Sequence, residues 1–331
     1  MDILSNNVIT YDCIRASVEI TAEELKSFIV KNGDILFQRS SETLEDVGRA
    51  NVYMDDKPAV FGGFVIRGKK KSEYNPLFFK YLLATPYARR KIIPMGAGAQ
   101  HFNIGQEGLS KVKLYFPILQ EQHKIASLLQ LIDERISTQN KIIEKLQSLI
   151  KGIAQHCIKE STSGNAYVKL GDICQITTGK LDANAKVDNG IYPFFTCAER
   201  PFKIDSFAFD TEALLISGNG ANLGYINYYN GKFNAYQRTY VLDIFSENIQ
   251  YIKWALKVLL PKRIAIEKSS SNTPYIVLST LSNLRLPIPN KNNQCHIAKL
   301  MQSLERKLSS QIALNGFYNK LKQYLLRQMF I

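Results

Sequence analysis

Two long stretches of the chain place apolar residues at alternating steps of four and three, the spacing of a helix that buries one seam against a partner helix. The first stretch is residues 117–160 and the second is residues 289–331. Seam positions of the first are Ile125, Leu129, Ile132, Ile136, Gln139, Ile143 and Leu146. Seam positions of the second are Ile297, Met301, Leu304, Leu308, Gln311 and Leu325, with Leu300, Leu314 and Leu321 widening the stripe. A helix of about 37 residues is about 55 Å long. So long a stripe must be buried, and we expect each helix to cover the other.

The openings of these two helices repeat each other. FPILQEQHKIASLLQLIDERI at 116–136 aligns with IPNKNNQCHIAKLMQSLERKL at 288–308, which places Gln122 on Gln294. The mixed segments in front of the helices match more loosely: VGRANVY aligns with LGYINYY, and AVFGGFVI aligns with NAYQRTYV. Small solenoid repeats have only about 20 to 50 residues. The longer repeat here indicates that a whole domain plus a helix has been duplicated.

The duplication predicts an α+β fold with a pseudo-two-fold internal repeat, in which two mixed α/β domains are joined by two long helices that form an antiparallel coiled coil. Two similar units related by an approximate two-fold axis place their helices in opposite directions. The expected segments are the first domain at 1–116, the first long helix at 117–160, a linker and the second domain at 161–288, and the second long helix at 289–331. Gln139 and Gln311 then share a register, either as a polar pair that fixes it or as side chains tolerated at the seam edge.

Short strands and one helix are expected in each mixed domain. In the first domain the predicted strands are GDILFQRS, NVYM and VFGGFVIRG, and a helix over NPLFFKYLLATPYARRKI is expected to be interrupted near Pro86. In the second domain the predicted strands are YVKLGDICQIT, EALLIS, GYINYY and YVLDIF, followed by a helix over QYIKWALKVLL. The segment YVKLGDICQIT has no counterpart in the first domain, which we therefore expect to lack its opening strand.

The composition is that of a soluble globular protein with room for about two domains: 331 residues, of which 45% are hydrophobic and 21% charged. No apolar run reaches the roughly 18 to 20 residues that cross a membrane. The start, MDILSNNVITYD, lacks the basic and apolar regions of a signal peptide, so we expect a cytoplasmic protein without membrane contact. The five cysteines form no C-x-x-C pair, which argues against a zinc site.

The formal net charge of +13 favours an anionic partner. Basic residues concentrate at 67–91 and at 253–268, which are corresponding places of the repeat. The side chains expected to contact phosphates are Arg67, Lys69, Lys70, Lys71, Arg89, Arg90, Lys91, Lys262 and Arg263. The alternative interpretation is an ordinary solvated surface.

The motifs of common active sites are incomplete in this sequence. MGAGAQHF lacks the third glycine of a dinucleotide-binding loop, and SGNGANLGY lacks the G-K-[ST] of a phosphate-binding loop. NPLF has Leu77 where the N-P-P-F motif of amino-methyltransferases has its second proline. The four histidines are scattered, and no triad, carboxylate pair or metal cluster emerges. We therefore expect neither a catalytic residue nor a bound metal.

The opening of the first long helix resembles the central conserved region of type I restriction-modification specificity (S) subunits. The residues that match the family pattern are Pro117, Glu121, Gln122, Ile125, Ala126, Asp133 and Ile136. VKLGDICQITTGK and the GDIL at 33–36 resemble the opening of a target recognition domain in the same family. The second copy departs from the pattern, with Asn293 in place of Glu121.

This resemblance implies a non-catalytic subunit whose two target recognition domains each bind half of a split site in double-stranded DNA. The paired helices would set the gap between the half-sites and dock methyltransferase (modification) subunits, which carry S-adenosylmethionine. Restriction motor-nuclease subunits, which use ATP and Mg²⁺, would complete the complex. The chain itself would then hold no cofactor.

Polar loops beside the basic stretches are the natural readers of base edges, because Arg, Lys, Asn and Gln make the most informative contacts with bases. GAGAQHFN at 96–103 and SSSNTPYI at 269–276 match across the repeat. The loop residues expected at DNA are Arg39, Gln100, His101, Lys180, Asn219, Arg238 and Asn272. For each of them the alternative is a structural turn.

Three other interpretations stay open on the sequence alone. They are a methyltransferase or nuclease with its own recognition domain, a free-standing sequence-specific DNA-binding regulator, and an inactive specificity subunit truncated at the N-terminus. Turnover without a partner would favour the first, and failure to form a stable heteromer would favour the second.

Overall fold

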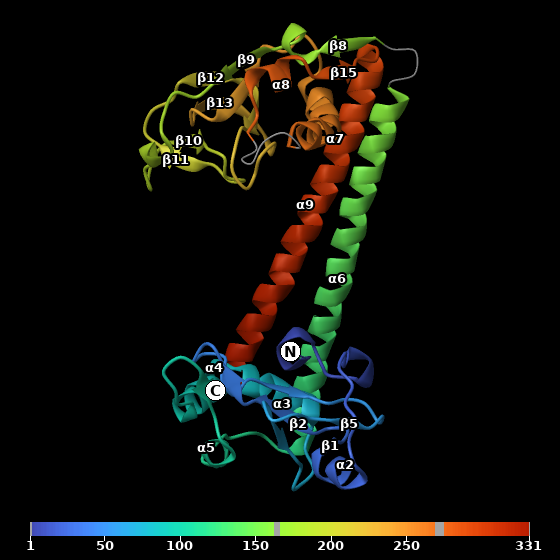
Figure 1. The fold of residues 1–331 in the computed structure, drawn as a ribbon, viewed down its shortest axis with the longest axis vertical. Helices are drawn as coiled ribbons and strands as arrows, with labels where there is room; N and C mark the ends of the chain where they lie inside the picture. The colour runs from blue at the N-terminus through green and yellow to red at the C-terminus, as the bar shows by residue number, and fades with distance from the viewer. Residues whose placement is uncertain (1, 162–165, 269–274, 331) are drawn as a thin grey trace. The chain divides into compact units, whose positions relative to one another are not determined.

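A computed structural model describes residues 2–161, 166–268 and 275–330 (Figure 1). The chain forms two compact units: unit 1 is Met1–Lys141 with Ile312–Ile331, and unit 2 is Ile142–Gln311. Each unit contains sheets, short helices and part of both long helices, so the predicted α+β class is confirmed.

Unit 1 is built from small antiparallel sheets. Its central sheet has the order β4–β2–β6, with Leu36 of β2 opposite Asn51 of β4 and Arg67 of β6. The strands are β1 (Ile29–Val30), β2 (Ile35–Gln38), β3 (Ser40–Ser41), β4 (Ala50–Val52), β5 (Ala59–Val60), β6 (Val65–Gly68) and β7 (Phe102–Asn103). The short helices are α1 (Asp2–Ser5), η1 (Tyr11–Cys13), α2 (Ala22–Phe28), α3 (Pro76–Ala84), α4 (Pro86–Ile92), η2 (Ile93–Met95) and α5 (Gln106–Ser110).

The interruption expected near Pro86 separates α3 from α4. Thr85 stands between them, where its hydroxyl accepts a hydrogen bond from the Ala88 N–H at 3.2 Å and donates one to the Leu82 carbonyl at 2.6 Å. A proline in the first position of α4 costs no helical hydrogen bond, because that position has no intrahelical partner for an N–H.

Unit 2 is built on a six-stranded sheet of order β11–β10–β13–β12–β14–β9, in which only β10 and β13 are parallel neighbours. A separate pair joins β8 to β15. The strands are β8 (Tyr167–Lys169), β9 (Gln175–Thr178), β10 (Tyr192–Phe195), β11 (Phe202–Ile204), β12 (Phe209–Ser217), β13 (Ile226–Ala235), β14 (Thr239–Asp243) and β15 (Arg285–Pro287). The short helices are η3 (Leu170–Asp172), η4 (Ala183–Ala185) and α8 (Leu278–Ser282), and the longer α7 (Ile249–Lys268) packs on the sheet.

The end of α7 differs from the sequence prediction. The expected helix stops at Leu260, in front of Pro261, whereas α7 continues through this proline. Ile264, beyond the proline, is buried in the same core as Leu214 and Leu256. The packing of this side chain favours continuing the helix, while Pro261 itself lies exposed.

The long helices are α6 (Leu119–Glu160) and α9 (Lys291–Gln328), and they pack antiparallel within each unit (Figure 1). In unit 1 Asp133 pairs with Lys322 and Asn140 with Asn315, so residue numbers fall along one helix as they rise along the other. In unit 2 Ile150 of α6 shares a core with Met301 of α9. Each helix begins two residues after the proline expected to open it, Pro117 or Pro289.

Every seam residue named above is buried or half-buried. Gln139 is only 5% exposed and Gln311 is half-buried. The expected widening of the second stripe is wrong for two residues: Leu300 is 45% exposed and Leu314 is 38% exposed. One partner helix covers only a narrow seam, and a wider stripe would need a further element against it.

The glutamine near the start of α6 ties this helix to the mixed domain of unit 1. Gln122 accepts a hydrogen bond through Oε1 from the Asn75 backbone N–H at 3.0 Å and donates through Nε2 to the Pro117 carbonyl at 2.8 Å. The Asn75 side chain in turn caps α3 by accepting from the Phe78 N–H at 2.9 Å. The start of α3 is thus fixed to the start of α6.

Unit 2 repeats this connection at the start of α9. Gln294 accepts from the Asn248 backbone N–H at 3.0 Å and donates to the Pro289 carbonyl at 2.8 Å. The Asn248 side chain accepts from the Tyr251 N–H at 3.0 Å and so caps α7. The glutamine shared by the two sequence repeats therefore performs the same task in each unit.

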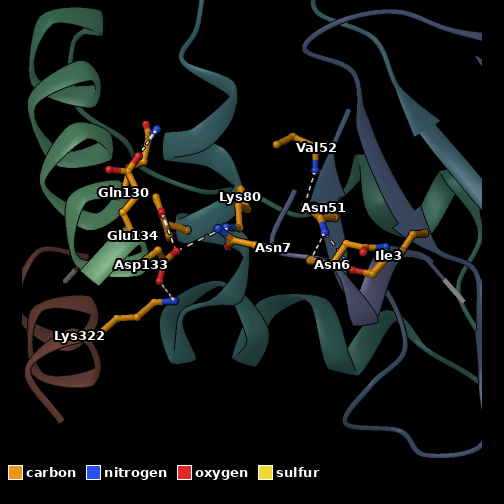
Figure 2. A network of polar contacts seen from close by, with 11 residues as sticks. Ile3, Asn6, Asn7, Asn51, Val52, Lys80, Gln130, Asp133, Glu134 and Lys322 are labelled. Carbon is orange, nitrogen blue, oxygen red and sulfur yellow. Dashed lines mark hydrogen bonds and ion pairs between the residues drawn. The ribbon is translucent and has the colours of Figure 1, made fainter. Parts of the chain in front are cut away.

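A buried carboxylate joins three helices of unit 1 (Figure 2). Asp133 of α6 is 8% exposed and accepts a hydrogen bond from the Tyr81 hydroxyl at 2.8 Å. It also pairs with Lys322 of α9 at 2.5 Å and with Lys80 of α3 at 3.6 Å. Burial lowers the pKa of Lys80 to about 8, although the Asp133 carboxylate opposes this shift.

A second group in the same view ties the N-terminal helix to the sheet (Figure 2). The Asn51 side chain on β4 donates to the carbonyls of Ile3 and Asn6 at 3.1 and 2.9 Å, and its oxygen accepts from the Val52 N–H at 2.8 Å. One buried amide thereby satisfies three backbone groups that would otherwise have to find other partners.

We predict that Asp133→Asn lowers the free energy of unfolding by about 3 kcal/mol, because it leaves two partly buried ammonium groups without their counterion. Lys80→Met should change it by less than about 1.5 kcal/mol, since Lys322 still neutralises Asp133. Urea unfolding measures both values, and equal losses from the two substitutions would contradict this account.

The wild-type chain and the Lys80→Met variant should also differ in how their stability depends on pH. The native pKa of Lys80 is about 8, below its ordinary value of 10.5, so as pH rises the native state loses this proton before the unfolded state does. The unfolded state then binds more protons, and stability rises with pH. The wild-type chain should therefore gain stability relative to Lys80→Met between about pH 8 and 10.5, measured by urea unfolding at pH 7 and pH 9.5.

Candidate nucleic-acid interface

A basic cleft of about 940 Å³ opens beside the central sheet of unit 1. Arg67 lies on β6, residues 69–71 follow this strand, and Arg39 follows β2, which pairs with β6. The cleft therefore brings together five of the predicted DNA contacts: Arg39, Arg67, Lys69, Lys70 and Lys71. None of the described residues that border it is acidic, so its field attracts a polyanion.

Local contacts orient the cations at the rim of this cleft. Arg39 Nη1 donates to the Gly63 carbonyl at 3.3 Å, and the Arg67 guanidinium lies 5.3 Å from the centroid of the Phe61 ring. Lys70 pairs with Glu73 at 3.0 Å, but both side chains are well exposed to solvent. Such an exposed pair contributes little, and a phosphate can replace the carboxylate.

A smaller cleft of about 310 Å³ lies at the corresponding place of unit 2. In unit 1 the Arg39 N–H donates to the Phe64 carbonyl at 2.9 Å, and in unit 2 the Gly218 N–H donates to the Arg238 carbonyl at 2.9 Å. The same two segments thus border each cleft: the end of β2 or β12, and the turn before β6 or β14.

At the two segments that border both clefts the arginine stands on opposite sides, and the unit 1 cleft has a further arginine, Arg67, on β6. In unit 1 Arg39 stands at the strand end and the turn contributes Gly62 and Gly63, with Phe64 next to them outside the cleft lining. In unit 2 Gly218 stands at the strand end and Arg238 in the turn. Phe64 is 78% exposed, and the sequence prediction missed it. The sequence marks Phe64 only by its position, directly after the Gly-Gly pair of a turn. Different side chains at equivalent places give the two clefts different surfaces for a ligand.

Other predicted contacts of unit 2 lie on segments joined to this cleft. The Gln237 N–H donates to the Leu181 carbonyl at 2.9 Å, which places the exposed Lys180 next to the turn that carries Arg238. Asn219 is half-buried, and its side-chain oxygen accepts from the Cys197 thiol at 3.0 Å. Asn272 lies outside the described residues.

Gln100 and His101 are exposed in a tight loop of unit 1. A bridge between Ala97 and Asn103 closes this loop. Gly98 has a φ of +145°, and a Cβ there would lie 1.9 Å from the His101 carbonyl oxygen, so the turn requires glycine. The loop presents both predicted readers to solvent.

Arg89 and Lys91 make contacts within unit 1. The Arg89 Nη2 donates to the carbonyls of Glu45 and Val47, each at 2.7 Å, and burial lowers the pKa of its guanidinium. Lys91 Nζ donates to the Lys113 carbonyl at 2.9 Å. These two cations support the loops around them, a use that the sequence prediction did not foresee.

Part of the second basic stretch is also used internally. Lys253 and Lys257 of α7 pair with Glu305 of α9 at 2.7 and 3.0 Å. Glu305 is the residue that the repeat aligns with Asp133, so each unit holds a helix against its long pair with lysines on the same acidic position. Lys262 and Arg263 lie further along α7 and are exposed.

Within residues 2–161, 166–268 and 275–330, no three His, Cys, Asp or Glu side chains gather as metal ligands. None of the helices described for this chain combines the length and apolar character of a membrane span.

Comparisons with known proteins identify relatives of this chain. One family model matches residues 1–148 and 162–314, and it is described as the type I restriction modification DNA specificity domain. The EcoDI specificity subunit of Escherichia coli is 41% identical over 143 residues, which cover 43% of this chain and 32% of that protein. The MjaVIII specificity subunit of Methanocaldococcus jannaschii is 23% identical over 338 residues, which cover 87% of this chain and 75% of that protein.

Solved structures show the same fold. The S subunit of a type I restriction-modification system from M. genitalium gives a TM-score of 0.63 at 19% identity, covering 92% of this chain and 84% of that one. A structure from work on the assembly and conformational transition of a type I R-M system gives a TM-score of 0.56 at 18% identity, covering 91% and 82%. At these identities the similarity concerns the fold alone.

We expect Arg89→Met to lower the free energy of unfolding by about 2 kcal/mol, because it removes a charged donor from two carbonyl acceptors. Arg90→Met is the matched control and should cost less than about 0.5 kcal/mol, since Arg90 is exposed and its Nε donates only to the Pro86 carbonyl of its own helix, at 3.2 Å. Guanidinium unfolding followed by circular dichroism compares the two variants. Similar values for both would show that the Arg89 contacts are dispensable.

Proposed function

Since this chain belongs to the family of type I restriction-modification DNA specificity domains, we propose that it is a specificity subunit and binds a bipartite site in double-stranded DNA. The family match extends over both sequence repeats. The observation that carries the proposal is the pair of equivalent clefts, one in each unit, each with an arginine at its border. Each cleft would take one half of the target.

The proposed contacts divide by chemistry. Lys69, Lys70 and Lys71 are exposed ammonium groups, which suit phosphates and supply affinity without sequence information. Arg39 and Arg238 carry the forked donors that recognise guanine edges, and Phe64 offers an apolar surface for a thymine methyl group. The two units would therefore read different half-sites, because Arg39 and Arg238 stand on different segments of their clefts.

The proposal assigns no chemical step to this chain, which would act as a non-catalytic subunit in the cytoplasm. Modification subunits would supply the methyltransferase activity with S-adenosylmethionine, and restriction motor-nuclease subunits would supply nuclease activity with ATP and Mg²⁺. The outer face of α6 in unit 1 suits docking of a modification subunit, because Lys124, Gln130 and Glu134 are exposed there. Among the described residues, these side chains bond only within their own helix. Lys124 pairs with Glu121 at 2.8 Å, and Gln130 donates to Glu134 at 3.1 Å.

Neutralising the unit 1 cleft should weaken DNA binding at every sequence. We expect Lys69→Gln, Lys70→Gln and Lys71→Gln together to reduce the slope of log K against log salt by about one to three units, because each lost phosphate contact removes about 0.9. Fluorescence anisotropy with a labelled duplex between 50 and 300 mM salt measures the slope. The matched control changes three exposed lysines of α6, Lys141, Lys145 and Lys151, to glutamine. An unchanged slope in the cleft variant would place DNA elsewhere.

Charge reversal on the outer face of α6 should prevent assembly with a modification subunit. Lys124→Glu with Glu134→Lys keeps the net charge, so a lost heteromer in gel filtration of the co-expressed subunits would reflect the surface itself. The helical circular-dichroism signal and DNA binding should stay at wild-type levels, with Lys26→Glu on the exposed surface of α2 as the control. Assembly of the double variant at the wild-type level would count against docking at this face. A wild-type chain that forms no heteromer would instead favour a free-standing DNA-binding regulator.

A further inference from the structure

The guanidinium of Arg67 lies against an aromatic ring inside the basic cleft of unit 1. Its Cζ is 5.3 Å from the centroid of the Phe61 ring, within the range of a cation–π contact. Lys69, Lys70 and Lys71 follow Arg67 along the chain and border the same cleft, but their side chains are exposed and none of the described rings lies over them. One cation of the cleft therefore has a support that its neighbours lack.

The Phe61 ring is itself anchored. It packs against the core cluster that contains Val30 and Leu36. It also meets the Phe28 ring edge to face, with 5.6 Å between the centroids, and the Phe61 N–H donates to the Phe28 carbonyl at 3.3 Å. Phe28 directly precedes β1 and Phe61 directly follows β5, so the pairing of these two strands brings the rings together. The cation thus lies on a ring that the core holds in place.

The pleat of β6 directs Arg67 toward this ring. Side chains alternate along a strand, so Val65 and Arg67 share one face of β6. Val65 packs against the same cluster as Phe61, whereas Ile66, on the opposite face, belongs to another core cluster. The register places Arg67 opposite Leu36 of β2, which is buried beneath that face. The side-chain direction of Arg67 is therefore set by the sheet.

Arg67 keeps its hydrogen-bond donors available. Within the described parts of the chain, its guanidinium has no hydrogen-bond acceptor and no paired carboxylate. By contrast, Arg39 Nη1 donates to the Gly63 carbonyl at 3.3 Å, and Arg89 Nη2 donates to two carbonyls at 2.7 Å. A guanidinium whose plane is fixed and whose donors are unused loses little freedom when it forms two parallel hydrogen bonds with a ligand.

We propose, on the basis of the DNA-binding function above, that Arg67 reads a guanine in the half-site of unit 1 and that Phe61 is its positioning residue. Guanine presents O6 and N7 in the major groove, and one guanidinium contacts both acceptors at once. This role replaces the phosphate contact that the sequence suggested for Arg67. A phosphate contact needs charge but no fixed plane, and the three lysines that follow supply it.

The corresponding place of unit 2 has a different side chain. Leu215 stands three residues before Gly218, as Leu36 stands three residues before Arg39, and Leu215 pairs with Val241. Val241 therefore takes the place of Arg67, and it is fully buried. A buried valine offers no hydrogen bond to a base, so the guanine contact belongs to one half-site only.

The first test compares the full chain with two glutamine variants by selection of bound duplexes from a randomised library and by the salt dependence of binding. The wild-type chain should prefer guanine about tenfold or more at one position of one half-site. Arg67→Gln should lose this preference and keep the salt slope. Lys71→Gln should keep the preference and lower the slope of log K against log salt by about 0.9.

The second test concerns the positioning role of the ring. Phe61→Leu removes the aromatic face and should reduce the guanine preference severalfold, with the other selected positions and the salt slope unchanged. Phe61→Tyr keeps the ring and should restore the preference. General damage to unit 1 would weaken all selected positions together, so a change confined to the guanine position separates positioning from stability.

The third test changes the DNA and leaves the protein intact. Replacing the selected guanine by 7-deazaguanine removes the N7 acceptor and should weaken wild-type binding by about tenfold. The same replacement should leave the affinity of Arg67→Gln unaltered, because that variant has no guanidinium to lose the contact.

Retention of the guanine preference by Arg67→Gln, or a salt slope lowered by about 0.9 in that variant, would assign Arg67 to a phosphate and overturn the inference. Equal wild-type affinity for guanine and 7-deazaguanine duplexes would also exclude it, and an unchanged preference in Phe61→Leu would remove the positioning role. A wild-type chain that enriches no motif would overturn the proposed function as well. The wild-type selection thus tells the two failures apart.

Discussion

The burial of one apolar seam on each long helix is the constraint on which the rest of this structure depends. Neither α6 nor α9 can hide its stripe of Ile and Leu side chains alone, and in each unit the other helix covers it. Burying a side chain such as Leu129 contributes roughly 1.5 to 3 kcal/mol, so the summed seam outweighs the individual polar contacts. Those contacts determine instead which element meets which. Asn140 bonds to Asn315 and Asp133 to Lys322, and this fixes the register of the antiparallel pair.

Each mixed domain is attached to this pair by the same two devices. A glutamine, Gln122 or Gln294, bonds the start of a long helix to the start of α3 or α7. An acid further along the same long helix, Asp133 or Glu305, pairs with lysines of α3 or α7. The attachments agree closely between the two units, whereas the sheets differ. The sheet that contains β2 has three strands, and the sheet that contains β12 has six. Such a design lets the sheets change while the helical support is kept.

The basic residues fall into two physical groups. Arg89, Lys80 and Lys253 are partly or largely removed from water and satisfy carbonyls or carboxylates of their own unit. A cation in that position has already lost its hydration and found partners, so a phosphate has little to offer it. Lys69 and Lys71 stay solvated and can exchange water and counterions for a polyanion. Net charge therefore overstates the surface available to a polyanion.

The sequence by itself determined the parts of this protein that depend on local periodicity and on the repeat. The seam spacing predicted the two long helices, and the duplication predicted their antiparallel pairing. The alignment of Gln122 with Gln294 marked a shared connection before its bonds were known. Only the tertiary structure decided which basic side chains face inward, since burial of Arg89 depends on carbonyls about 40 residues away in the chain. It also decided that α7 passes Pro261, because the packing of Ile264 outweighs a local helix-breaking signal. The clefts arise from segments far apart in sequence, and no short-range pattern encodes such neighbours.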